Sequence, residues 1–147
     1  MYMSWFNYYG LIIIALIMVP NVVFAILHKD GFENKYNNRL CEAFEQIGRY
    51  ACFGLMIFNI PYTYFGFYFP FADVVYLAVN GGLVLSYLLV WVIMWKKDNL
   101  LRAVLLSAIP STIFIFSGIM VASIPLIVFS IIFAVTHILI SVKNALT

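Results

Sequence analysis

The sequence predicts an all-α, polytopic membrane protein built as a bundle of five transmembrane helices. Of its 147 residues, 65% are hydrophobic and only 10% are charged, and the mean hydropathy is +1.04. A soluble domain carries about 25% charged residues, so a water-soluble fold of this size cannot hide so much apolar surface. Runs such as LIIIALIMV and LIVFSIIFAV do not alternate, which argues against the strands of a membrane barrel.

Five apolar segments approach the length of about 20 residues that a membrane-spanning helix needs. Within one integral membrane domain, 1–147, they cover residues 9–27, 48–69, 72–95, 100–121 and 124–142. The last two segments are separated by no charge, but Ala122 and Ser123 precede Pro125, which fits the first turn of a new helix. One continuous helix there would be about 64 Å long, twice the thickness of the membrane core.

The basic residues predict the orientation of the chain. With five spans, all eight fall on one side of the membrane: Lys29, Lys35, Arg39, Arg49, Lys96, Lys97, Arg102 and Lys143. The positive-inside rule makes that side cytoplasmic, with the N-terminus outside and the C-terminus inside. The opposite side carries Asp73 and many aromatic rings, which favour the level of the lipid headgroups. We therefore expect a multi-pass protein of the cytoplasmic (inner) membrane.

A polar stripe begins where the second segment meets the cytoplasmic side. Asn37 or Asn38 can cap a helix that starts there and continues into the membrane. Residues on one face of this helix recur at intervals of three and four: Glu42, Glu45, Arg49, Cys52, Met56 and Asn59. Glu45 and Arg49 stand at i, i+4 in the favourable acid-before-base order, so we expect them to form an ion pair.

Two interpretations of this stripe remain open. The pair can simply anchor the end of the helix, with Arg49 extending toward the headgroups. Alternatively, it borders a cavity that is open to the cytoplasm, because an ionisable group facing a bundle interior indicates a site. In that case polar groups of other spans meet the stripe in the inner half of the membrane. The predicted ligand-binding residues are Asn21, Glu42, Glu45, Arg49, Cys52, Asn59 and His137.

No motif indicates catalysis, a metal or a cofactor, and none is predicted. His28, His137, Cys41, Glu42 and Glu45 lack the spacing of a metal site. Cys41 and Cys52 lie eleven residues apart on one expected helix, about 16 Å, which is too far for a disulfide. The net charge of +2 gives no reason to expect nucleic acid as a partner.

The sequence favours a non-enzymatic protein that binds or transports a small or amphipathic molecule through this stripe. The expected partners are the lipid bilayer, a small-molecule or lipid ligand, and further copies of the chain or a larger membrane complex. One alternative is a small membrane enzyme that acts on a lipid, with Glu45 or His137 as the acid or base. Another is an assembly or regulatory subunit in which every polar stripe serves helix packing.

Overall fold

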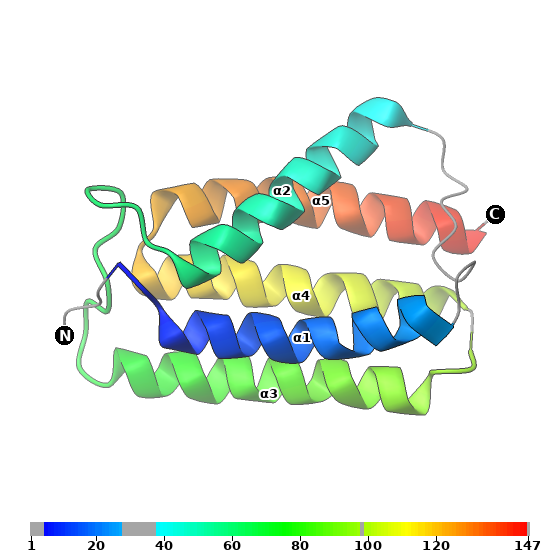
Figure 1. The fold of residues 1–147 in the computed structure, drawn as a ribbon, viewed down its shortest axis with the longest axis horizontal. Helices are drawn as coiled ribbons and strands as arrows, with labels where there is room; N and C mark the ends of the chain where they lie inside the picture. The colour runs from blue at the N-terminus through cyan, green and yellow to red at the C-terminus, as the bar shows by residue number, and fades with distance from the viewer. Residues whose placement is uncertain (1–4, 28–37, 98, 147) are drawn as a thin grey trace.

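The computed structural model describes residues 5–27, 38–97 and 99–146 and confirms the predicted all-helical class (Figure 1). The helices are α1 (Tyr8–Leu27), α2 (Arg39–Ile57), α3 (Ala72–Ile93), α4 (Leu100–Val121) and α5 (Ile124–Leu146). The described residues form no strand beyond an isolated bridge between Phe6 and Phe58. Four helices, α1, α3, α4 and α5, are long and apolar enough to cross a membrane.

These four helices run side by side along the long axis of the molecule, and α2 crosses them obliquely (Figure 1). Helix α4 packs against both α3 and α5, α1 packs mainly against α3, and α2 packs mainly against α5. The first turn of α2 meets the bundle through α5, since Cys41 is buried with its Sγ 4.0 Å from the Thr136 carbonyl oxygen, whereas its last turn lies among the other helices (Figure 1).

The second predicted segment is where the structure differs from the sequence prediction. Residues 48–69 were expected to be the membrane-spanning part of a helix that starts after Asn37 or Asn38. Helix α2 does begin at Arg39, but it ends at Ile57. The expected cap is confirmed, because the side chain of Asn38 accepts a hydrogen bond of 3.1 Å from the backbone N–H of Cys41. The charges of α2, at Arg39, Glu42, Glu45 and Arg49, separate it from the four apolar helices. A fifth transmembrane helix is therefore not shown.

Helix α2 ends because the chain beyond it forms other backbone hydrogen bonds. The Asn7 N–H donates to the Ile57 carbonyl at 2.7 Å, and the Asn59 N–H donates to the Trp5 carbonyl at 2.7 Å. Pro61 follows closely, lacks an N–H, and would clash with a preceding helical turn. The segment before α1 thus forms a short stretch of backbone pairing with the end of α2 and the residues after it.

The two ends of the bundle differ in composition. One end gathers the start of α1, residues 58–71 and the turn between α4 and α5 (Figure 1). There Ala122 adopts a left-handed conformation with φ of 52°, which ends α4 and confirms the predicted turn before Pro125. The other end carries basic residues: Arg39, Lys96, Lys97, Arg102 and Lys143.

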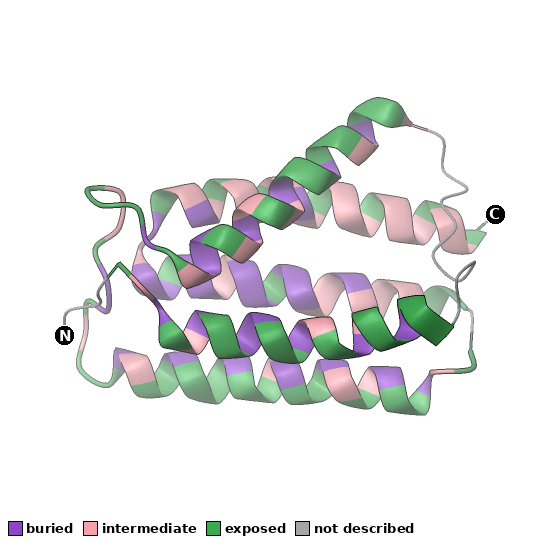
Figure 2. Cartoon of the chain, in the orientation of Figure 1, coloured by how far each residue is buried: buried purple, intermediate pink, exposed green. Residues whose placement is uncertain are grey.

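The outer surface of the bundle is largely apolar. Figure 2 shows long exposed faces on α1 and α3. Large exposed side chains on these helices include Val19, Ile26 and Val92. Helix α2 has the same character, because Leu40, Phe44, Ile47 and Tyr50 are exposed while Glu45 is buried. This is the reverse of a helix on the surface of a water-soluble domain.

Candidate functional site

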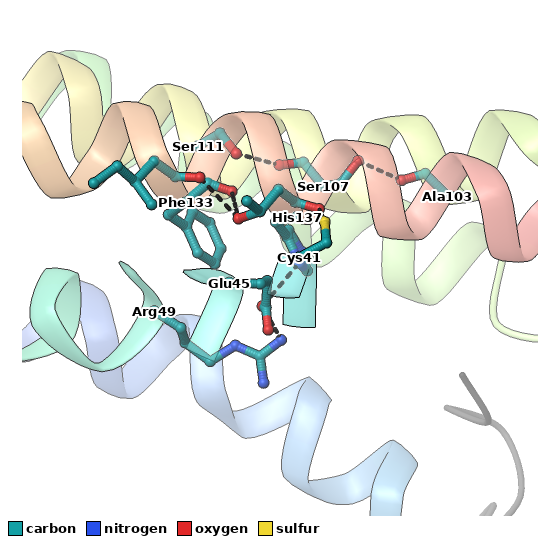
Figure 3. Close-up of polar contacts among 10 residues, drawn as sticks. Cys41, Glu45, Arg49, Ala103, Ser107, Ser111, Phe133 and His137 are labelled. Atoms are coloured by element: carbon teal, nitrogen blue, oxygen red, sulfur yellow. Dashed lines mark hydrogen bonds and ion pairs between the residues drawn. The ribbon is translucent and has the colours of Figure 1, made fainter. Parts of the chain in front are cut away.

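A carboxylate buried between two helices forms the centre of the candidate site. Glu45 of α2 is only 3% exposed and points toward α5 (Figure 3). Its Oε1 contacts the Nη2 of Arg49 and lies 3.3 Å from the Nδ1 of His137 on α5. The predicted pairing of Glu45 with Arg49 is therefore confirmed. We refer to Glu45, Arg49 and His137 as the inner cluster.

A close approach of α2 to α5 brings these side chains together. Gly48 lies between Glu45 and Arg49 in the sequence, and a Cβ atom at this position would stand 3.0 Å from the backbone nitrogen of Phe133. Glycine therefore allows the two backbones to approach closely enough for Glu45 to reach His137. The ring of Phe133 also stacks on the imidazole of His137, with ring centroids 4.6 Å apart and planes inclined by 18°. The imidazole is thus oriented by a ring on one side and a carboxylate on the other.

The guanidinium of Arg49 is the accessible part of the inner cluster. The Arg49 side chain is 33% exposed, whereas that of Glu45 is 5% exposed. In Figure 3 the guanidinium points away from α5. Within the described parts of the chain, its hydrogen-bonding contact is with Glu45 through one of its five N–H donors.

Asn21 lies close to this cluster, on the side of α1 and α3. Its side-chain N–H₂ group donates to the Tyr87 hydroxyl at 2.7 Å and to the Ile17 carbonyl at 2.8 Å. Tyr87 of α3 is in turn near enough to Arg49 for the two groups to interact electrostatically. Of the two residues expected to meet the stripe from other helices, His137 contacts Glu45 directly, whereas Asn21 is linked to Arg49 through Tyr87.

Other predicted ligand residues are placed differently. Cys52 is fully buried on the inward face of α2, and Glu42 is half-buried one turn before Glu45. Asn59 is buried as expected, but it follows the end of α2 and its N–H donates to Trp5. Asn59 thus stands beyond the end of α2 at Ile57 and pairs with the segment before α1.

The opposite face of α2 largely follows the prediction that it is exposed. Phe44, Ile47 and Phe58 are exposed, but Leu55 is buried at 8% exposure. Leu55 belongs to the hydrophobic core of the bundle because the last turns of α2 lie among the other helices. The exposed apolar face of α2 therefore becomes narrower toward the end of the helix.

Two apolar grooves on the molecule lie away from the inner cluster. One, of about 320 Å³, runs between α1 and α3 and is lined by residues including Ile12, Leu16 and Gly81. The second, of about 610 Å³, adjoins it near Pro20, Trp91 and Trp95. Both are almost wholly apolar, and no predicted ligand residue lines either. The site at Glu45 is thus a polar contact between α2 and α5, and the Arg49 side chain is its partly exposed member.

Sequence reasoning missed two residues that build this site, Gly48 and Phe133. A glycine inside a helix weakens it by about 1 kcal/mol relative to alanine, so Gly48 between two charged residues signals a close approach. Phe133 stands four residues before His137, on the same face of a helix, and this spacing predicts that the two rings can meet. Neither signal identifies the partner helix.

The described residues contain no group of three or more His, Cys, Asp or Glu side chains that could hold a metal ion. Cys41 and Cys52 are free thiols. Comparison of the chain with protein-family models, with curated proteins and with solved structures gives no match. The chemistry of the inner cluster is therefore the basis for a functional proposal.

Proposed function

We propose that this chain is an integral membrane protein that binds a small amphipathic molecule at the inner cluster. The proposal rests on Arg49, because the described residues accept a hydrogen bond from only one of its nitrogens. Arg49 is anchored by Glu45 at one nitrogen, is one-third exposed, and lies in a predominantly apolar surface. A cation in such surroundings is stabilised by an anionic partner.

The geometry favours a ligand with a carboxylate or phosphate group and an apolar body. Guanidinium binds such groups through two parallel hydrogen bonds, which a lysine ammonium cannot reproduce. Glu45 and His137 hold Arg49 in place through the buried carboxylate. An anchoring pair alone would need neither the histidine nor the close packing of Gly48 on α5.

Native mass spectrometry of protein purified in a mild detergent tests this proposal. We expect the wild-type protein to retain an anionic amphipathic molecule, and Arg49→Gln to reduce the bound fraction about tenfold, as one charge-assisted contact is worth about 1.5–3 kcal/mol. Arg49→Lys keeps the charge but loses the two-pronged geometry, so binding weakens while folding is retained. Arg39→Gln is the matched control, because Arg39 is exposed at the start of the same helix. Equal retention by the wild type and Arg49→Gln would overturn the proposal.

We further propose that α2 is a fifth span, tilted across the other four. Its 19 residues correspond to about 28 Å, which when tilted covers part of the hydrocarbon thickness of about 30 Å. Residues 58–71 continue from it to the end of the bundle (Figure 1). It buries Glu45 and exposes Leu40, Phe44 and Ile47, as a helix surrounded by lipid does. With five spans, the basic end of the bundle faces the cytoplasm and the N-terminus lies outside.

The side on which each end of the chain is labelled separates five spans from four. In a Cys41→Ser, Cys52→Ser background, we expect a cysteine at Asp73 to react with an impermeant reagent from outside. Cysteines at Lys97 and Lys143 should react only after the membrane is opened. If α2 does not cross, the N-terminus and Lys143 lie on the same side. Labelling of an N-terminal tag and of Lys143 from one side would therefore exclude five spans.

A specific contact supports the enzymatic alternative, in which the inner cluster acts on a lipid. A carboxylate that orients an imidazole is the arrangement of many general bases, and Glu45 lies 3.3 Å from His137 Nδ1. His137→Gln separates the two functions. It leaves Arg49 available for binding, whereas an acid–base role of His137 predicts that turnover of the bound lipid is lost.

A further inference from the structure

A second set of polar side chains lies at the other end of the bundle, away from the inner cluster. We refer to Asn7, Tyr76, Asn80 and Ser117 as the outer chain. Asn7 precedes α1, is 3% exposed, and donates from its side-chain nitrogen to the Tyr76 hydroxyl at 3.2 Å. Its oxygen accepts from the Gly10 N–H at 3.1 Å, which caps the start of α1. Asn7 is therefore fixed by two bonds and holds the tyrosine of α3.

The outer chain continues from Tyr76 to side chains that lie deeper, between α3 and α4. Tyr76 also interacts with the side chain of Ser117 on α4. The side-chain N–H₂ group of Asn80 donates to Ser117 Oγ at 2.9 Å, and Tyr76, Asn80 and Ser117 all have no exposed surface. The hydroxyl of Ser117 is thus shared between a tyrosine and an asparagine.

One atom of the outer chain lacks a hydrogen-bond partner among the described residues. The Oδ1 of Asn80 is buried and accepts no hydrogen bond from any described residue. Reversing the amide would give the oxygen a donor in Ser117 but would leave the nitrogen without an acceptor. In either orientation, a fully buried amide retains an unmet hydrogen-bonding group, which is unfavourable in an apolar interior.

We propose that Asn80, together with Ser117 and Tyr76, binds a water molecule inside the bundle. Water supplies the missing donor and can also bond to the neighbouring hydroxyls, which matches the two to four polar partners of buried waters. A cation is disfavoured, because the neighbours in contact with Asn80 are neutral and its burial would need a compensating charge.

The proposed water lies at Asn80, the residue of the outer chain that is deepest in the bundle. Along α3 the buried residues Tyr76, Asn80, Val84 and Tyr87 lie on one face. Asn80 and Tyr87 are separated by about 10 Å along the helix, with the apolar Val84 between them. The proposed water therefore lies about two helical turns from Tyr87, whose hydroxyl bonds to Asn21.

Solid-state NMR of the whole protein in lipid bilayers tests this proposal. Magnetisation transferred from water protons should reach the ¹⁵N-labelled side chain of Asn80 several times faster than the backbone amide of Phe114. Phe114 is the dry reference, because it is equally buried in α4. The Asn80 side-chain signal is assigned in the wild-type protein by its correlation with the Asn80 backbone. Transfer to Asn80 no faster than to Phe114 would overturn the proposal.

The thermal stability of Asn80→Leu gives an independent readout. If water completes the hydrogen bonds, leucine removes them, and we expect the midpoint of unfolding in detergent to fall by a few degrees. If the amide oxygen is buried dry, leucine removes an unmet polar group and the midpoint rises. A rise would count against the water site, and a failure of Asn80→Leu to fold leaves the NMR measurement on the wild type decisive.

Discussion

The inner cluster carries full charges and reaches the surroundings through Arg49, whereas the outer chain is neutral and completely enclosed. The inner cluster joins α2 to α5, and the outer chain joins the start of α1 to α3 and α4. Buried neutral groups that bond to one another fix how helices pack. A charge left one-third exposed on an apolar surface is not required for packing. The difference explains why we assign ligand binding to the inner cluster alone.

Removing the shared carboxylate is expected to have the largest effect on this comparison. Glu45→Ala leaves Arg49 and His137 without their common partner. The destabilisation is expected at about 3 kcal/mol, the lower limit for breaking a buried pair, because Arg49 can turn toward solvent or headgroups. Thermal unfolding in detergent measures it as a lower midpoint. A change below about 0.5 kcal/mol would mean that the pair contributes no more than an exposed salt bridge.

Separating α2 from α5 should have a somewhat smaller effect. In Gly48→Val, the added Cβ meets the backbone of Phe133, so α2 must move away from α5. Overpacking of this kind costs about 1–3 kcal/mol, and the Glu45–His137 contact should be lost with it. Gly54→Val is the matched control on the same helix, because a Cβ there meets no atom within 4 Å. Equal unfolding midpoints for the two variants would contradict the close approach.

A pair of serines on α4 tests the outer chain with the smallest expected effect. Ser117→Ala removes the acceptor of Asn80 and should lower the free energy of unfolding by about 1–2 kcal/mol. Ser107→Ala should be milder, because the Ser107 hydroxyl bonds only to the Ala103 and Val104 carbonyls of its own helix. Both serines are buried, so chemical denaturation compares them directly. A larger loss in Ser107→Ala would remove the distinction between the two kinds of serine.

The apolar segments of α1, α3, α4 and α5 could be predicted from the sequence because each is a long run without charge. The start of α2 was also predictable from Asn38, and the pairing of Glu45 with Arg49 from their spacing. These features depend on neighbours within one helix. They require no knowledge of which helices pack together.

The end of α2 could not be predicted because it depends on a contact distant in sequence. The segments FGLMIFNIP and YTYFGFYFP are apolar enough to resemble one continuous span. Pairing of Ile57 and Asn59 with residues before α1 redirects the backbone instead. For the same reason, neither the pairing of Asn59 with Trp5 nor the position of Asn7 beside Tyr76 could be predicted from the sequence.

The close contact at Gly48 also determines how α2 can move. Its start, Arg39, lies nine residues from that contact, about 14 Å along the helix, whereas Glu45 lies about 4.5 Å from it. Helix α2 can therefore be compared to a lever that pivots against Phe133, with Glu45 near the pivot and the start of the helix, where Cys41 contacts Thr136, at the far end. A rotation of about 20° would carry the start of α2 roughly 5 Å while moving Glu45 by less than 2 Å. Because Arg39 lies about three times as far from the contact at Gly48 as Glu45 does, a force applied at the start of α2 would act about threefold more strongly at Glu45, where α2 meets His137.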